Sequence, residues 1–161
     1  MKNLLKNILL LFLLIILPTG ILFGCSSQKA SKKNPSSKEI GEKIKQAMDL
    51  SQMKDGDSEK LYKSYDIKEN EIENFFLLTP PSNIKAEELL IVKLKDSKDI
   101  DSIKEKIQNR VDAQSTSFKD YLPEEYNLIE NHILEVKDNF IFFTISKDGD
   151  KQKELFYESF K

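Results

Sequence analysis

Cysteine, histidine, glycine and tryptophan are scarce in this sequence, and each shortage excludes a class of chemistry. The chain has 161 residues, with one cysteine, one histidine, five glycines and no tryptophan. Since the only thiol is Cys25, the residues after it contain no disulfide, no cysteine metal ligand and no cysteine nucleophile. The glycines beyond that point, Gly41, Gly56 and Gly149, form no glycine-rich loop that would cradle a phosphate. A domain built from these residues is therefore stabilised by packing alone.

An excess of charge of one sign is also missing. The chain carries 25 basic and 27 acidic residues, for a formal net charge of −2 at pH 7. Nucleic-acid-binding domains present a basic stripe or patch, so this balance predicts no nucleic-acid partner. Lysine supplies every basic residue except Arg110, which we interpret as compositional bias and not as chemistry.

Long apolar runs are absent except near the N-terminus. Lys2 and Lys6 precede an unbroken apolar stretch over residues 8–17, which Pro18 and Gly20 then interrupt. The stretch falls short of the roughly 20 apolar residues that a membrane-spanning helix needs, and it has the size of the hydrophobic segment of a signal peptide. Proline and glycine disfavour helix, so the backbone before a cleavage site is free to be extended.

The segment Leu22-Phe23-Gly24-Cys25 resembles the bacterial lipobox, in which a branched apolar residue and two small residues precede a cysteine. Phe23 is bulkier than that pattern prefers. The resemblance implies cleavage between Gly24 and Cys25, a thioether-linked diacylglyceryl group on Cys25 and acylation of the new amino group. It therefore predicts a lipoprotein signal peptide at residues 1–24 and a lipid anchor on the outer side of the cell membrane. The alternative is an uncleaved membrane anchor with an incidental cysteine.

The residues after the cysteine divide into a tether and one domain. Residues 25–36 begin with the lipidated cysteine and continue as a polar stretch without apolar periodicity, which predicts a flexible tether. Residues 37–161 are long enough for one folded domain with its own core and too short for two.

Helical periodicity recurs in this domain. Ser36 and Glu39 fit a capping box at the start of the first helix. The strongest helix covers about residues 99–119, because apolar residues recur on one face from Ile100 to Phe118, with Gln114 in the same stripe. The other predicted helices cover about residues 37–50, 59–65 and 151–160, and residues 124–131 form a loop or a short helical turn.

Strand patterns occur in two pairs. The predicted strands are residues 71–79, 88–95, 132–137 and 139–146, and residues 55–58 have the composition of a turn. Along the second strand, Leu90, Val92 and Leu94 share a face, and lysines occur on the other, which predicts a sheet covered on one side. The order helix, helix, strand, strand, long helix, strand, strand, helix predicts an α+β two-layer sandwich. Its four-stranded, mainly antiparallel sheet carries the helix at 99–119 across one face.

The domain resembles the DUF4358 family of uncharacterised bacterial lipoproteins. The matching segments are Leu61-Tyr62, Tyr65-Asp66-Ile67, Ile84-Lys85-Ala86-Glu87-Glu88, Gln114-Ser115-Thr116-Ser117-Phe118-Lys119-Asp120-Tyr121-Leu122-Pro123 and Lys137-Asp138-Asn139-Phe140. The resemblance implies a secreted, lipid-anchored module. It implies no catalytic residue, because none is established for the family.

No candidate for chemistry forms a complete motif. His132 lacks partners at metal-ligand spacing, and the Asp-Gly-Asp segments at 55–57 and 148–150 do not continue into a calcium-binding loop, so we predict no metal and no cofactor. The acid pairs Glu87-Glu88 and Glu124-Glu125 have the residue type needed for acid–base cleavage of a glycoside, and they define the alternative of an envelope hydrolase.

The segment after the long helix has two interpretations, and the functional one is a recognition patch. Phe118, Asp120, Tyr121 and Pro123 combine aromatic and charged groups, as binding surfaces do. The competing interpretation, which we favour, is that Tyr121 and Leu122 pack the corner while Pro123 turns the chain. The sequence as a whole predicts a non-enzymatic binding or accessory module of the cell envelope, with the membrane and an envelope protein as partners. A structural spacer with an exposed apolar patch is a further alternative.

Overall fold

The computed structural model describes residues 34–161. The predicted signal peptide, the cleavage site between Gly24 and Cys25, and the tether up to Lys33 lie outside the described residues, so those predictions stay open. Among the helices of residues 34–161, none combines the length and the apolar character needed to cross a bilayer.

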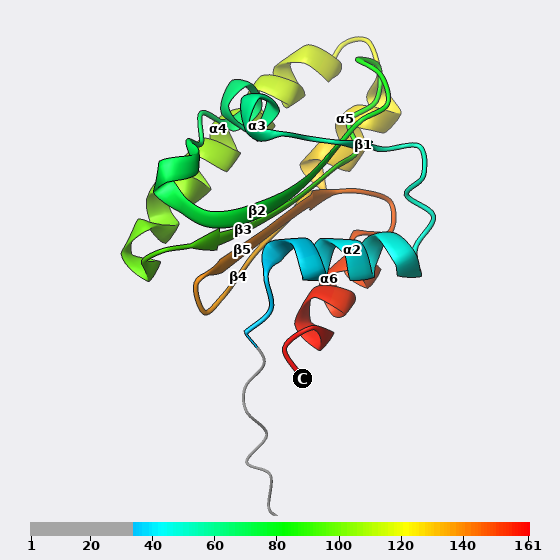
Figure 1. The fold of residues 1–161 in the computed structure, drawn as a ribbon. Helices are drawn as coiled ribbons and strands as arrows, with labels where there is room; N and C mark the ends of the chain where they lie inside the picture. The colour runs from blue at the N-terminus through cyan, green and yellow to red at the C-terminus, as the bar shows by residue number, and fades with distance from the viewer. Residues whose placement is uncertain (1–33) are drawn as a thin grey trace, which may run out of the picture. The chain divides into compact units, whose positions relative to one another are not determined.

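Five α-helices and five strands make up the described part of the chain (Figure 1). In chain order they are α2 (Ser37–Ala47), β1 (Lys54–Asp55), α3 (Ser58–Tyr65), β2 (Ile72–Thr79), β3 (Glu88–Leu94), α4 (Ile100–Phe118), α5 (Pro123–Glu130), β4 (Ile133–Lys137), β5 (Phe140–Ile145) and α6 (Gly149–Glu158). Short 3₁₀ turns at Glu69–Glu71 and Ser97–Asp99 precede β2 and α4. Every helix and strand of the predicted order is present, and β1 and α5 are additional to it.

The strands form one antiparallel open sheet in the order β1-β2-β3-β5-β4. Ile91 in the central strand β3 lies opposite Phe76 on one side and Phe142 on the other. The α+β class, the antiparallel sheet and the long helix across one face are confirmed. The sheet has five strands where the sequence predicted four, because the two residues Lys54 and Asp55 pair with the end of β2 where we expected a turn.

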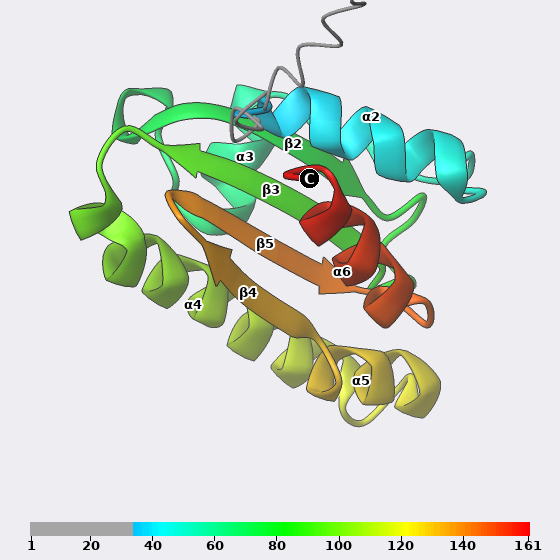
Figure 2. The same ribbon diagram turned by 90° about the horizontal axis from the view of Figure 1, so that it is seen from below.

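Helices cover both faces of this sheet, so the fold has three layers where the sequence predicted two. Figures 1 and 2 show α4 and α3 on one face and α2 and α6 on the other. Each face has its own buried apolar cluster, which contains Leu90, Val92 and Phe143 on the α4 face and Leu89, Ile91 and Phe142 on the α2 and α6 face. All seven residues of β3 are buried, so the predicted partly wet face of this strand is wrong.

The reason is that the apolar stripes of α2 and α6 need a partner surface. Ile40 and Ile44 of α2 and Phe156 of α6 are fully buried against the odd-numbered face of β3. Lys93 is accommodated on that face because its ammonium pairs with Glu73 at 2.8 Å and lies 5.5 Å from the ring centre of Phe140.

Local sequence explains where the helices begin. Ser36 and Glu39 form the predicted capping box of α2. The carboxylate of Asp57 accepts a hydrogen bond from the Lys60 amide at 2.8 Å and so caps α3. Pro123 occupies the first turn of α5, where its missing N–H costs no helical hydrogen bond. The segment 124–131, left between loop and helix by the sequence, is therefore mostly helical.

Candidate functional site

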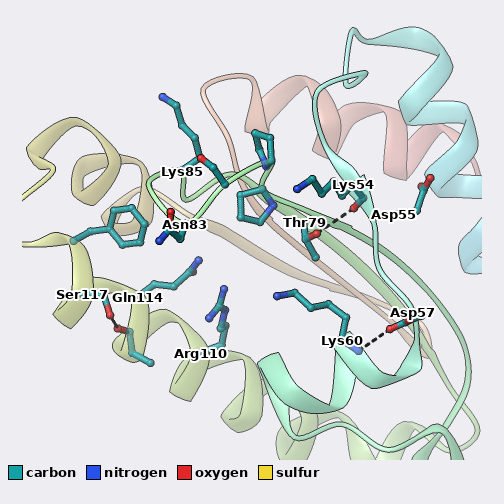
Figure 3. Close-up of a pocket in the computed structure, with 15 residues that line it drawn as sticks. Lys54, Asp55, Asp57, Lys60, Thr79, Asn83, Lys85, Arg110, Gln114 and Ser117 are labelled. Carbon is teal, nitrogen blue, oxygen red and sulfur yellow. Dashed lines mark hydrogen bonds between the residues drawn. The ribbon is translucent and has the colours of Figure 1, made fainter.

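A cavity of about 640 Å³ opens where one end of the sheet meets α3 and α4. Its walls come from β1, from the start of α3, from the loop between β2 and β3 with Pro80 and Pro81, and from the C-terminal half of α4 (Figure 3). The volume lies within the range of about 300–1,000 Å³ that is typical of small-ligand sites. Four basic and two acidic side chains line it: Lys54, Lys60, Lys85, Arg110, Asp55 and Asp57.

Arg110 is held in place from behind by a buried carboxylate. Glu88, at the start of β3, is fully buried and pairs with Nε and Nη2 of Arg110, the first at 3.3 Å. The hydroxyl of Tyr65, at the end of α3, donates to the same carboxylate at 2.7 Å. Three elements thus meet at Glu88, and Nη1 of Arg110 is the guanidinium nitrogen that this pair leaves for other contacts.

The pKa values of this cluster follow from its burial. Burial raises the pKa of the Tyr65 hydroxyl well above its usual value, and the neighbouring charge of Glu88 adds to the rise. Burial alone would lower the pKa of Arg110, but the hydrogen bonds and charge of Glu88 outweigh it and raise this pKa. Tyr65 therefore stays a neutral donor and Arg110 a cation at any physiological pH.

Both acidic side chains of the cavity already have hydrogen-bond or ion-pair partners, whereas two of its lysine side chains have none within residues 34–161. Asp55 pairs with Lys45 of α2 at 2.8 Å, and Asp57 caps α3. Within residues 34–161, the ammonium groups of Lys54 and Lys60 have no ion pair or side-chain hydrogen bond. The cavity is therefore cationic even though the whole chain is mildly acidic.

Gln114 adds an amide to this cationic surface. Its side chain is 4% exposed, lines the cavity, and lies one helical turn after Arg110 on α4 (Figure 3). Oε1 of Gln114 is the one buried side-chain polar atom without a hydrogen-bond partner in the described part of the chain. A buried, unpaired acceptor costs about 1–3 kcal/mol, so a donor that paired with this atom would stabilise the arrangement.

A second buried carboxylate shapes the rim. Glu125 of α5 accepts hydrogen bonds from Nζ of Lys85 at 2.6 Å and from the backbone amide of Ala86 at 2.9 Å. Burial acts to raise the pKa of Glu125, but these two hydrogen bonds outweigh it and lower the pKa. The loop before β3 is thereby fixed to α5.

Only one member of the predicted recognition patch belongs to the cavity. Phe118 ends α4, is 7% exposed and lines the cavity. Asp120 and Pro123 are exposed, and Tyr121 is 82% exposed, so the expectation that Tyr121 packs the corner is wrong. Leu122 does pack against the α4-side core. A recognition role for Phe118, Asp120, Tyr121 and Pro123 stays a prediction.

The other residues that the sequence suggested for chemistry do not come together in one site. Glu88 and Glu125 are buried in separate ion pairs, while Glu124 is exposed. Nδ1 of His132 lies 2.7 Å from the carbonyl oxygen of Ile129, and the ring packs near Phe143. Within residues 34–161, no group of three or more metal-binding side chains converges.

Sequence reasoning missed the cluster around Arg110. Its members lie on α3, β3 and α4, and no local spacing connects them. One signal was present, because the single arginine of a lysine-rich chain borders the apolar stripe of the strongest helix, three residues after Ile107 and four before Gln114. Arginine binds carboxylates through two nitrogens at once, which lysine cannot do. The interpretation of Arg110 as compositional bias overlooked this difference.

Fold and cavity together define a small α+β domain with a side-chain-lined, cationic site. Comparison with protein families finds that residues 46–146 match the family described as "Domain of unknown function (DUF4358)". The match covers more than half of the chain and all the cavity residues named above, so the protein belongs to the DUF4358 family. No curated protein and no solved structure matches the chain.

Proposed function

We propose that this chain is a lipoprotein held on the outer side of the cell membrane through Cys25, and that its folded domain is a non-enzymatic module that binds an anionic ligand. The observation that carries the proposal is the cationic cavity, in which Lys54 and Lys60 have no counter-ion among the described residues while Arg110 is fixed by Glu88. Cationic donors that converge in a concave site are what a small anion requires.

The surroundings of the carboxylates favour binding over catalysis. A carboxylate pair that hydrolyses a glycoside needs one acid with a raised pKa beside a second, ionised acid. Glu125 instead has a lowered pKa, and the carboxylate of Glu88 is already occupied by Arg110 and Tyr65. The predicted hydrolase therefore gains no support from this geometry.

The membrane anchor is supported by the sequence. Leu22, Gly24 and Cys25 fit the lipobox, and the apolar stretch at 8–17 has the length of a signal peptide core. Two or more acyl chains anchor a protein stably, at about 0.8 kcal/mol per buried methylene. Such an anchor would hold the cavity near the membrane, where an envelope component or partner protein presents the ligand.

The anchor is tested by replacing the sulfur nucleophile. Cys25→Ser in the native host is expected to abolish incorporation of a labelled fatty acid and to leave a longer, unprocessed chain, measured by mass spectrometry. The matched control Ser26→Ala changes a neighbouring hydroxyl and is expected to be labelled and processed normally. Labelling that persists in Cys25→Ser contradicts the proposed anchor.

The binding role is tested on the full chain purified in a non-ionic detergent. Calorimetric titration with phosphate, sulfate and tartrate is expected to give saturable binding of at least one anion, and titration with glycerol none. The double variant Lys54→Gln/Lys60→Gln is expected to lose the signal, whereas Lys151→Gln on the distant helix α6 is expected to keep it. If no anion binds the parent chain, the proposed function is wrong.

A further inference from the structure

Four cations and two carboxylates line the cavity, and two of the cations have no ion-pair partner within residues 34–161. Arg110 is balanced by Glu88, but the ammonium groups of Lys54 and Lys60 are balanced by no residue within 34–161. A ligand that neutralises both lysines carries close to two negative charges. A phosphate monoester meets this requirement, because it carries about −1.5 to −2 at pH 7.

The cations also approach from different directions. Figure 3 shows Lys54 extending from β1, Lys60 from α3 and Arg110 from α4 toward the same space, whereas Lys85 points away from it. A carboxylate offers two oxygens in one plane, but the three terminal oxygens of a phosphoryl group accept hydrogen bonds from three sides. Arginine and lysine are the usual partners of such a group.

Gln114 indicates what else the ligand contains. Its Oε1 is buried and unpaired, and its side chain reaches the cavity beside Arg110. The terminal oxygens of a phosphoryl dianion are acceptors only, so they cannot satisfy this atom. Oε1 has almost no surface that a ligand can reach, so the amide must turn about its last bond to present this oxygen to the cavity. A hydroxyl group on the organic part of the ligand would then donate to it and remove the cost of a buried, unpaired acceptor.

We propose that the ligand is a phosphate monoester of a hydroxylated compound, such as a polyol or a sugar. Lys54, Lys60 and Nη1 of Arg110 hold the phosphoryl oxygens, and Oε1 of Gln114 accepts a hydrogen bond from a nearby hydroxyl. This inference rests on the proposed function, since it specifies the anion that the same cavity takes.

Matched ligand pairs test the two halves of the inference on the full chain in a non-ionic detergent. Methyl phosphate is expected to bind at least about tenfold more tightly than dimethyl phosphate, as the loss of one charge-assisted hydrogen bond implies. Glycerol 3-phosphate is expected to bind more tightly than propyl phosphate, which has the same carbon chain without hydroxyl groups. Dissociation constants from calorimetry give both ratios.

Variants assign each preference to its residues. Lys60→Gln is expected to reduce the tenfold preference for methyl phosphate over dimethyl phosphate. Gln114→Leu is expected to abolish the preference for glycerol 3-phosphate over propyl phosphate while leaving methyl phosphate binding within about threefold, because the phosphoryl contacts remain. Lys151→Gln is expected to keep both preferences, and circular dichroism verifies that each variant is folded.

The outcomes separate this inference from the proposed function. Binding of tartrate or sulfate without a preference for the phosphate monoester overturns the inference and leaves an anion-binding module. An unchanged hydroxyl preference in Gln114→Leu also overturns it. Tighter binding of hexanoyl lysophosphatidic acid than of glycerol 3-phosphate would support the inference with a lipid headgroup as the source, and weaker binding would support it with a soluble ester.

Discussion

At the scale of single residues, Glu88 is the group on which the arrangement of the site depends. It is fully buried, and within residues 34–161 its charge is balanced by Arg110 alone, while its carboxylate also accepts a hydrogen bond from Tyr65. Removing one partner of a buried ion pair leaves the other charge without compensation, which costs more than replacing both partners.

This asymmetry gives the first prediction. Arg110→Met is expected to lower the free energy of unfolding by about 3 kcal/mol, because Glu88 stays buried and unpaired. Glu88→Gln/Arg110→Met is expected to recover most of that loss, since the neutral amide still accepts from Tyr65. Urea denaturation measures both variants, and additive losses in the double variant would contradict the coupling.

Glu125 gives a prediction about pH. Its pKa is lowered in the folded state, so its contribution to stability is complete above the ordinary glutamate pKa of about 4.3 and is lost as the pH falls below that value. Glu125→Gln is expected to be less stable at pH 7 and to lose less stability between pH 6 and about pH 3.5 than the parent. Urea midpoints across this range measure the effect, and equal acid slopes would refute it. Glu154→Gln, at an exposed position of α6, is expected to keep the parent stability at pH 7.

The residues of the site illustrate what a sequence can predict. Phe118 and Gln114 were found in the apolar stripe of the long helix, since periodicity identifies any residue on that face. Lys54, Lys60 and Arg110 were not connected, because their proximity arises only when β1, α3 and α4 meet at one end of the sheet. A long-range meeting of this kind leaves no regular spacing in a single sequence.

At the scale of elements, α2 packs unusually close to the sheet. A Cβ atom added to Gly41 would lie 2.1 Å from the ring of Phe76 on β2, a distance that forces one of the two elements to move. The absence of a side chain at Gly41 therefore sets the separation between helix and strand.

This contact predicts a reversal of normal helix propensity. Gly41→Ala, which favours an exposed helix by about 1 kcal/mol, is expected to destabilise this domain by about 2 kcal/mol through overpacking. The same change in a Phe76→Leu background is expected to cost less, because the smaller side chain makes room. Gln46→Ala at an exposed position of α2 serves as the control, and a stabilised Gly41→Ala chain would contradict the prediction.

Most elements were predictable because their apolar residues repeat with helical or strand spacing. The segment 88–95 shows the limit of this approach. Apolar side chains on both faces were visible in its sequence, but Lys93 suggested a wet face. The partners of Lys93, which are Glu73 and Phe140, lie on other strands, so the local sequence did not reveal them. The two-residue strand β1 is too short to produce any period.

At the scale of the whole molecule, one sheet serves two cores. Alternate side chains of β3 and β5 point into the α4 face and into the α2 and α6 face, so neither cluster can lose its helices without disturbing strands that the other needs. We therefore expect the described domain to unfold as one cooperative unit.

Phe156 tests this cooperativity. It is fully buried under α6, with its ring centre 5.0 Å from that of Phe142. Phe156→Ala is expected to cost about 4 kcal/mol and to weaken hydrogen-exchange protection in α4, on the opposite face, by the same free energy. Phe156→Leu is expected to cost less at both places. If α4 of Phe156→Ala kept the hydrogen-exchange protection of the parent chain, the two faces would unfold separately.

The solitary guanidinium of this chain also makes it chemically addressable. Since Arg110 is the only arginine in the sequence, a dicarbonyl reagent such as phenylglyoxal, which attacks guanidinium groups, has a single target of that type. Its rate of attack, followed by the mass of one peptide, would report occupancy of the cavity directly on intact cells. A compound that slows this modification of Arg110 binds at the cavity. Testing compounds one at a time would therefore identify the natural occupant without purification and without an assay of activity.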